Sequence, residues 1–495
     1  MSALPGEVAA PAAPAAVARR TRWLRLAPAA LVALVMACGV AAAFLYTFNH
    51  NASYLLHAAG QLLRGATLYV DVPEINPPLI VWLNLPIAWL AQQSGLHDAL
   101  VFRIAVLALG LLSVAWSSRL LRGQLAPGQW WSWLAVGMFA ALLVPGYEFG
   151  EREHLALLCV LPYLAEAARR CDARPLGPAT QAGVAALAIL GLALKPHFLV
   201  VPLLVESYAI WRLRKLSIGC VVAAALLLAY LAAAWLFAPH YLEMVRLLAG
   251  GYWGYARGWS SFLTVPYFLA SAILVLLACL VRPRAGRLPV VLGLAIAGFA
   301  LAAIVQQKAW SYHWVAVLSL AWMLFGQAAA TATAHRSAHG MPLAPLIVCS
   351  GAAVLALLAL ASARVDGHKV NPHPAELGPL IRELGGGPVL VFSTFQVSFP
   401  LVTEPGIGTS SRFPTMSIVH AMEKGGNRAA VAWIHRSFAE DFRRAPPRLL
   451  LLETGADGRP VVDFIEYFKQ DVPELQDFRV VRRTPRFMLL AAPQR

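Results

Sequence analysis

The chain has 495 residues, of which 59% are hydrophobic and 13% charged, and its mean hydropathy is +0.63. Because a soluble domain carries about 25% charged residues, one large soluble core is excluded, as are the disordered, collagenous and coiled-coil classes. The formal net charge of +15 comes largely from short basic clusters between apolar runs, which are typical of the cytoplasmic loops of membrane proteins. We therefore expect membrane lipids as partners and exclude nucleic acid.

The N-terminal segment combines a low-complexity stretch with a basic cluster. Residues 1–18 are rich in Ala and Pro and are predicted to be disordered. Four arginines then lie between positions 19 and 25, directly before an apolar run at 26–46. A cleaved signal peptide has a similar pattern, but this run is about 20 residues long and many more apolar runs follow. We therefore expect an uncleaved first span and a cytoplasmic N-terminus.

Ten further apolar runs with basic flanks are predicted to span the membrane: 101–118, 130–146, 154–168, 178–194, 198–211, 216–237, 262–281, 288–306, 314–329 and 343–363. Together with the first run they give eleven spans, and this odd number places the C-terminal part outside when the N-terminus is inside. The predicted inside loops hold 16 of the 24 basic residues that precede position 365, which favours this orientation.

One more apolar run, PPLIVWLNLPIAWLAQQ at 77–93, is a poor candidate for a span. Three prolines and Asn84 interrupt it, and counting it would place every later arginine cluster outside. We expect a helix that lies on, or dips into, the outer face.

The character of the chain changes from about residue 364. Charge density rises, and strand-like runs appear at 388–393, 448–453 and 478–492, alternating with helix-like segments. The predicted fold class is mainly α: a polytopic helical membrane bundle with about 11 spans and a small C-terminal extracytoplasmic α/β domain. The expected domains are a basic cytoplasmic N-terminus (1–25), a transmembrane domain (26–363) and a periplasmic α/β domain (364–495).

Ionisable residues are costly in a membrane, so their position is informative. Before the tail they gather in the predicted outside loops, above all in 47–100, which contains Asp71, and in 147–154, which contains Glu151, Glu153 and His154. Two acidic loops that face each other can supply a general base to an acceptor hydroxyl, or hold a divalent cation such as Mg²⁺ or Mn²⁺. The alternative is that these are solvated loop charges.

Basic and imidazole side chains at the same face suggest phosphate binding. We expect Arg152 and His154 to position phosphate beside the acids, and the candidate phosphate-binding residues elsewhere are Lys195, His197, Arg257, Lys308 and His313. The alternative for these residues is interfacial snorkelling next to an aromatic belt.

The order of these features resembles that of the GT-C glycosyltransferases, which include protein O-mannosyltransferases and the lipid A aminoarabinose transferase. After the first span comes an outside loop with a helix YLLHAAGQLLRG (54–65), then Tyr69-x-Asp71 and the motif PPL at 77–79. An acidic second loop follows, and an α/β tail closes the chain. The resemblance implies a polyprenyl-phosphate sugar donor, an inverting transfer to a lipid, glycan or protein acceptor, and a catalytic acid in the first loop.

The chain departs from the family at two positions. The family's acid, three or four residues before the tyrosine, falls on His50 and Asn51, and the lysine that precedes the proline pair in some members is Asn76. We therefore expect a carboxylate of the second loop, Glu153 in the first place, to act as the base with Asp71 as its partner, and Lys195 or Lys308 to bind the phosphate.

Three other readings remain open at this point. A transporter or flippase would also be polytopic, but it should show inverted repeats and charges near span midpoints, whereas here the charges lie at the outer ends. A polysaccharide polymerase or ligase would share the lipid-linked substrate. A non-catalytic scaffold is favoured by the absence of the family's acid.

Overall fold

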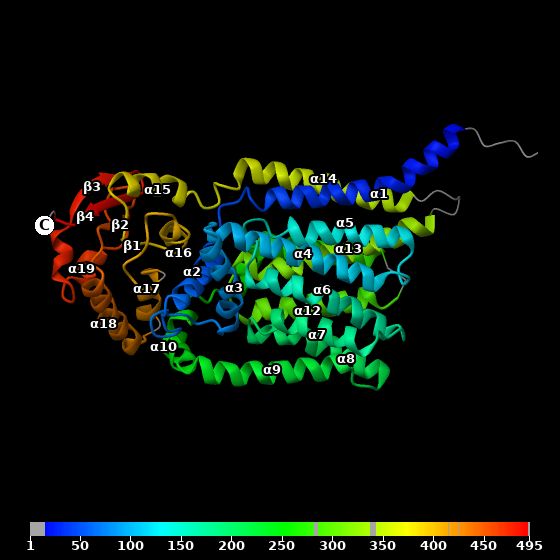
Figure 1. Cartoon of the computed structure of the whole chain (residues 1–495), viewed down its shortest axis with the longest axis horizontal. Helices are drawn as coiled ribbons and strands as arrows, with labels where there is room; N and C mark the ends of the chain where they lie inside the picture. The colour runs from blue at the N-terminus through cyan, green and yellow to red at the C-terminus, as the bar shows by residue number, and fades with distance from the viewer. Residues whose placement is uncertain (1–14, 282–285, 337–342, 414, 425, 494–495) are drawn as a thin grey trace, which may run out of the picture.

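Most of the chain forms a bundle of helices that lie side by side along the long axis of the molecule (Figure 1). The computed structural model describes residues 15–281, 286–336, 343–413, 415–424 and 426–493. Each of the eleven expected spans falls on one helix: α1 (Ala15–Ala42), α4 (Asp98–Leu121), α5 (Pro127–Leu142), α6 (Arg152–Cys171), α7 (Pro178–Leu192), α8 (Val200–Leu213), α9 (Ile218–Phe237), α11 (Pro266–Val281), α12 (Leu288–Val305), α13 (Val315–Arg336) and α14 (Leu343–Asp366). The predicted fold class is confirmed.

Five of the described helices are long and apolar enough to cross a membrane: α4, α9, α12, α13 with its preceding turn, and α14. Parts of α1, α7 and α11 are apolar but shorter. The helix α1 begins at Ala15, so it takes in the end of the stretch that was expected to be disordered, whereas residues 1–14 lie outside the described residues.

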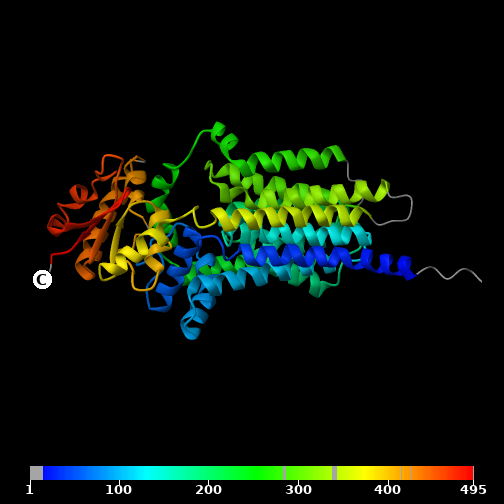
Figure 2. The same ribbon diagram turned by 90° about the horizontal axis from the view of Figure 1, so that it is seen from above.

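The start of α1 and the C-terminal domain lie at opposite ends of the bundle (Figures 1 and 2). We call the end that faces the C-terminal domain the domain end. The run at 77–93 forms α3 (Leu79–Ser94), which packs against α4 and against α2 (His50–Leu63) at the domain end. The first loop thus contributes two helices to the region between the bundle and the C-terminal domain.

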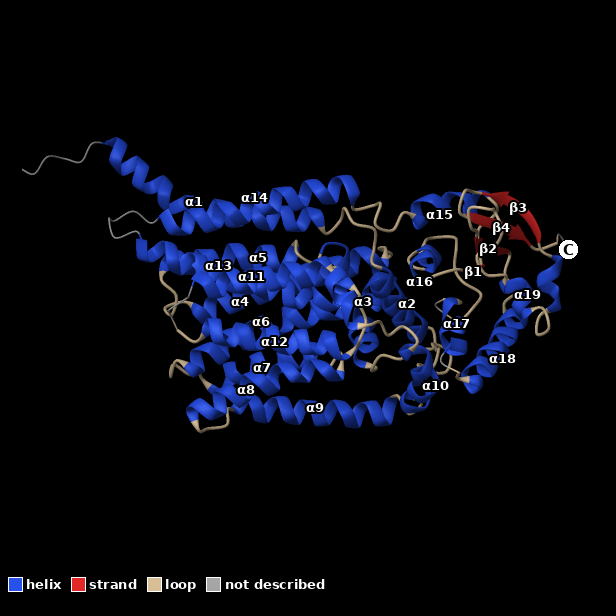
Figure 3. Cartoon of the chain, turned by 180° about the vertical axis from the view of Figure 1, so that it is seen from behind, coloured by secondary structure: helices blue, strands red, loops and turns tan. Residues whose placement is uncertain are grey.

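All four described strands lie in the C-terminal domain (Figure 3). The sheet has the order β1-β2-β4-β3, with β1 (Val389–Phe392) parallel to β2 (Leu449–Glu453), and with β4 (Phe487–Ala491) antiparallel to both β2 and β3 (Arg479–Arg483). The Leu-rich central strands are buried, whereas β3 is an exposed edge strand rich in arginine, as edge strands commonly are. The helical segments around the sheet are α15 (His373–Glu383), α16 (Phe395–Ser398), α17 (Ser417–Lys424), α18 (Arg428–Arg444) and α19 (Phe464–Phe468).

The C-terminal domain is held to the domain end by contacts with two segments. Helix α10 (Tyr241–Trp253) packs against α17 and α18, and the Asn427 side chain donates a hydrogen bond to the carbonyl of Leu247 over 2.8 Å. Helix α16 packs against α2, and the hydroxyl of Ser53 in α2 lies 3.2 Å from that of Thr403, in the turn that follows α16. The domain therefore covers the polar end of the bundle and shapes the cavity described next.

Candidate active site

A cavity of about 850 Å³ lies between the domain end of the bundle and the C-terminal domain. Its walls come from segments that are far apart in the sequence: the first loop with α2, the second loop, the segment before α13, and the C-terminal domain. Its polar and ionisable lining includes His50, Asn51, Tyr54, Glu74, Tyr147, Glu148, Arg152, Ser311, Tyr312 and Gln396. The cavity is therefore large enough for a small ligand and carries both carboxylates and a guanidinium.

The backbone of the second loop is fixed by a glycine and a histidine. Gly150 has a φ of +87°, and a Cβ atom there would lie 2.3 Å from Cε1 of Phe102, so only glycine fits. The Nδ1 of His154 accepts a hydrogen bond from the Gly150 amide over 3.0 Å, and its Nε2 lies 2.8 Å from the carbonyl of Ala141. Both ring nitrogens of His154 are thus used within the fold, and this residue supports the loop from behind the cavity.

The first loop meets the second loop through three consecutive side chains. Asn49 caps α2 by accepting from the amides of Asn51 and Ala52, and its amide group donates to Oε2 of Glu148 over 3.1 Å. Asn51 donates to Oε1 of Glu151 over 2.6 Å. His50 and Asn51, the positions onto which the sequence resemblance places an acid, therefore line the cavity and contact the acidic second loop.

Glu148 is the carboxylate of the second loop that lines the cavity. Besides the bond from Asn49, it accepts a hydrogen bond from the Ser311 hydroxyl over 2.6 Å. Burial raises the pKa of Glu148 to about 8, and the negative charge of Glu151 adds to the rise. The sequence predicts an acidic site in this loop with Glu151 and Glu153 as its members, because spacing along the chain does not show which loop side chains turn towards a cavity.

Behind the cavity wall, charged residues from three segments form a buried cluster. The ammonium of Lys195 lies 2.6 Å from Oε1 of Glu153, and Nε2 of His313 lies 3.9 Å from the same oxygen. Arg152 lies 3.7 Å from Glu151. These five residues are each less than 5% exposed. The structure thus brings together most of the residues that were expected to bind phosphate or to act as the base.

The ring of Tyr312 lies between the cations of this cluster. Its centroid is 5.2 Å from Nζ of Lys195 and 6.0 Å from Cζ of Arg152. Burial lowers the pKa of Lys195 to about 8, although the charge of Glu153 opposes this change. Arg152 both lines the cavity and contacts the cluster, so it joins the two parts of the site.

Lys308 and His197 interact electrostatically with the cations of this cluster, and Arg257 is linked to the segment that carries Lys308. Nζ of Lys308 lies 4.7 Å from the ring centroid of Trp310, and burial, together with the charges of Lys195 and Arg152, lowers its pKa to about 6. Arg257 is exposed, and its backbone amide donates to the carbonyl of Gln307, next to Lys308. Burial and the same group of cations lower the pKa of His197 to about 3, so its ring is neutral at pH 7.

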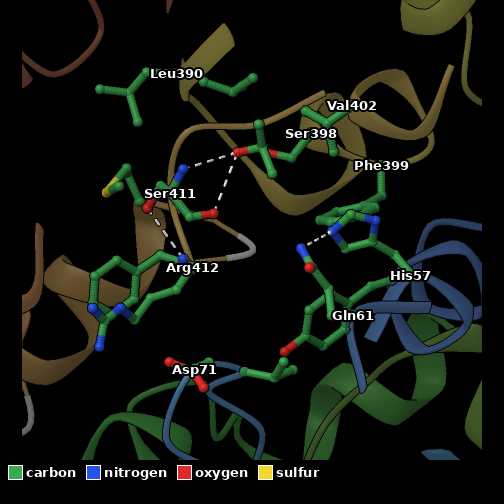
Figure 4. A pocket seen from close by; sticks show the side chains of 15 residues that line it. His57, Gln61, Asp71, Leu390, Ser398, Phe399, Val402, Ser411 and Arg412 are labelled. Atoms are coloured by element: carbon green, nitrogen blue, oxygen red, sulfur yellow. Dashed lines mark hydrogen bonds between the residues drawn. The ribbon is translucent and has the colours of Figure 1, made fainter. Parts of the chain in front are cut away.

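Asp71 lies apart from this cluster, in a small pocket of about 30 Å³ between the first loop and the C-terminal domain (Figure 4). One of its carboxylate oxygens accepts a hydrogen bond from the Thr67 amide over 2.8 Å. Figure 4 shows it on the opposite side of this pocket from Ser398, with Arg412 above it. The structure therefore does not bring Asp71 together with Glu153.

The first-loop carboxylate that lines the main cavity is instead Glu74. Its Oε1 accepts from the amides of Ile75 and Asn76, each over 2.7 Å, and from the Asn76 side chain over 2.6 Å. Asn76, which stands where some family members have lysine, thus holds this carboxylate. Among the described residues, no group of three or more His, Cys, Asp or Glu side chains is arranged to hold a metal ion.

Comparison with known proteins supports the fold. No family model and no curated protein matches the chain. The crystal structure of ArnT from Cupriavidus metallidurans bound to undecaprenyl phosphate matches 95% of this chain and 98% of that one, with a TM-score of 0.60 and 15% identity. The apo structure of the same protein matches 96% and 98%, with a TM-score of 0.59 and 14% identity. The resemblance seen in the sequence is thus confirmed for the fold: the chain has the architecture of ArnT over nearly its whole length.

Proposed function

We propose that this protein is a membrane glycosyltransferase that moves a sugar from a polyprenyl-phosphate donor to an acceptor at the outer face of the inner membrane. The observation that carries the proposal is the juxtaposition of Arg152 and Glu148 in one cavity of about 850 Å³ at the domain end. A lipid-linked sugar transfer needs a cation for the phosphate and a carboxylate for the acceptor hydroxyl. The fold shared with ArnT, which was crystallised with undecaprenyl phosphate, supports a donor of the same class.

The cavity lining suits a phosphate-linked sugar. Arg152 offers a planar fork of donors that matches a phosphate group, and Lys195 contacts the same Tyr312 ring as Arg152. Lys308 becomes charged when a nearby phosphate raises its low pKa. Aromatic rings of Tyr255 and Trp310 line the same cavity and provide surfaces on which a sugar ring can stack. Apolar side chains, among them Leu55 and Val265, line the rest and suit the first isoprene units.

The reaction that fits these groups is a single displacement. The acceptor oxygen bonds to the anomeric carbon, the bond between that carbon and the phosphate oxygen breaks, and polyprenyl phosphate leaves with the electron pair. A carboxylate of the site takes the proton of the acceptor hydroxyl. Charge that develops on the leaving phosphate is stabilised by the surrounding cations. One displacement inverts the configuration at the anomeric carbon, as the resemblance implies.

The proposal is tested with purified protein in lipid nanodiscs and undecaprenyl phosphate as the probe. We expect undecaprenyl phosphate to bind and to raise the melting temperature, and Arg152→Met to weaken binding at least tenfold. Arg246→Met, which removes an exposed arginine of the neighbouring helix α10, is the matched control and should bind as the wild type does. Equal binding by the wild type and Arg152→Met would contradict the proposed donor site.

Catalysis is tested separately with membranes that contain radiolabelled polyprenyl-phosphate sugars. Label should move to a lipid, glycan or protein fraction when the wild type is present, and parallel reactions with Mg²⁺, Mn²⁺ or EDTA determine whether a divalent cation takes part. Movement of intact labelled donor across the bilayer without transfer would favour a flippase. Binding without transfer or movement would favour a scaffold.

A further inference from the structure

The second loop contacts the positions onto which the resemblance places the missing acid. Three consecutive residues at the start of α2 contact three residues of this loop: Asn49 donates to Glu148, Nδ1 of His50 lies 2.9 Å from the Tyr147 hydroxyl, and Asn51 donates to Glu151. In each of these three contacts, the first-loop side chain is an amide or an imidazole rather than a carboxylate, and the contact holds the second loop close to α2. The first loop therefore presents carboxylates of the second loop at the position where it lacks its own.

Of the three carboxylates in the second loop, only one reaches the cavity. Glu151 and Glu153 are each 1% exposed and lie behind the wall, where Asn51 and Lys195 hold them. The ammonium of Lys195 lies 2.6 Å from Oε1 of Glu153, so this oxygen is already engaged in a buried ion pair. Glu148 lines the cavity together with Arg152 and Tyr312.

The remaining acid of the cavity, Glu74, is held in a different way. Three donors from Ile75 and Asn76 converge on one of its oxygens. This convergence ties the carboxylate to the turn that leads into α3. Glu148 has one neutral donor on each oxygen, Asn49 and Ser311, and each oxygen keeps a lone pair for a further partner.

We propose that Glu148 is the catalytic base, and that Asn49 and Ser311 are positioning residues that aim it at the acceptor hydroxyl. This inference rests on the proposed function. In the reaction, the acceptor O–H bond breaks as its oxygen bonds to the anomeric carbon, the proton passes to Glu148, and polyprenyl phosphate leaves. Protonated Glu148 then returns its proton to water, so the step needs no other reactant.

The surroundings of Glu148 keep it basic. Among the described residues it forms no ion pair. The carboxylates of Glu151 and Glu153 and the hydroxyls of Tyr147 and Tyr267 interact with it electrostatically, Asn49 and Ser311 donate hydrogen bonds to it, and Arg152 lines the same cavity. Burial and the two neighbouring carboxylates give it a pKa of about 8. A base with a pKa near the working pH is efficient because it combines a useful ionised fraction with a strong drive to accept a proton. The rate should therefore rise with pH up to about 8.

The test compares the wild type with Glu148→Gln in the transfer assay and in undecaprenyl phosphate binding. We expect kcat to fall by about 10²-fold or more, because general-base catalysis typically contributes that much. Donor binding and the melting temperature should stay within twofold and 2 °C or so, respectively, because glutamine keeps the size and an acceptor oxygen. Glu243→Gln, an exposed acid on α10, is the matched control and should keep full activity.

Two further variants keep the test decisive if Glu148→Gln folds poorly. Glu148→Ala should regain activity when formate is added, since a small carboxylate can enter the vacated space and accept the proton. Ser311→Ala should shift the pH profile of kcat and leave donor binding unchanged, which a merely structural role would not do.

The outcomes separate this inference from the proposed function. If the wild type transfers no sugar, the proposed function fails and the inference falls with it. If the wild type transfers and Glu148→Gln keeps more than one third of its kcat, the proposed function stands and Glu148 is not the base. A loss of kcat in Glu74→Gln instead would then assign the base to the first loop.

Discussion

Lys195 and Glu153 form an ion pair that is almost fully removed from water, with Nζ 2.6 Å from Oε1 and the two side chains only 4% and 1% exposed. The residues are 42 positions apart, one between α7 and α8 and the other in the first turn of α6. A buried charge without a partner loses its hydration free energy and gains nothing in return. In the ion pair, the attraction between the two charges offsets this desolvation penalty. The pair therefore fixes the three helices around the site and sets its electrostatics.

Removing one partner of this pair should destabilise the protein strongly. Lys195→Met leaves the Glu153 carboxylate buried without its counter-charge, which typically costs about 3–5 kcal/mol. Thermal unfolding in detergent measures the loss. The double variant Lys195→Met/Glu153→Gln removes both charges and should recover most of the stability. A double variant that is as unstable as Lys195→Met would show that the lysine stabilises the fold by packing rather than by charge.

Adding one methyl group to the second loop should disturb the site. Gly150→Ala places a Cβ atom 2.3 Å from Phe102 and forces alanine into a left-handed conformation, with an expected cost of about 2–4 kcal/mol. Sugar transfer should fall together with the melting temperature. Gly95→Ala is the matched control, because Gly95 also has a positive φ but no atom within 4 Å of the added Cβ. Equal melting temperatures of the two variants would exclude the steric contribution.

Binding of undecaprenyl phosphate should be coupled to proton uptake. Burial and the charges of Lys195 and Arg152 hold the pKa of Lys308 at about 6. At pH 7.5 the Lys308 side chain is therefore neutral in most molecules whose site is empty. A phosphate anion nearby favours the charged form and raises this pKa, and a proton is therefore taken up. Calorimetry at pH 7.5 in two buffers of different ionisation enthalpy measures the uptake. It should vanish in Lys308→Met, and the same uptake in that variant would assign the proton to another group.

The orientation of the bundle is testable with reporter fusions. Fusions after Arg122, Arg170, Arg214 and Arg287 should report the cytoplasm, because basic loops stay on that side of the membrane. Fusions at Glu151, at Arg257 and in the C-terminal domain should report the outside, since these segments are predicted to lie in the outside loops. An outside signal after Arg170 would contradict both the eleven-span orientation and a site at the outer face.

The architecture of this protein follows from its sequence to a large extent. Each of the eleven apolar runs forms a helix of the bundle, because backbone hydrogen bonds in a membrane must be satisfied within the segment itself. The interrupted run at 77–93 forms a short helix at the domain end, as its prolines and Asn84 indicated. The strands of the C-terminal domain are also recognisable from the local sequence. The leucines of the run RLLLLE, for example, indicate a buried strand, and they form the buried strand β2.

The composition of the site was decided by tertiary structure. The sequence placed Asp71 with Glu153, but Asp71 lies in another pocket, and Glu74, three residues further along, lines the main cavity. Likewise Glu148, rather than Glu151 or Glu153, turns towards that cavity. The family's acid position holds Asn51, whose role becomes visible only through its hydrogen bond to a residue 100 positions away. A span needs only its own apolar residues, whereas the direction of a loop side chain depends on partners that distant helices bring to it.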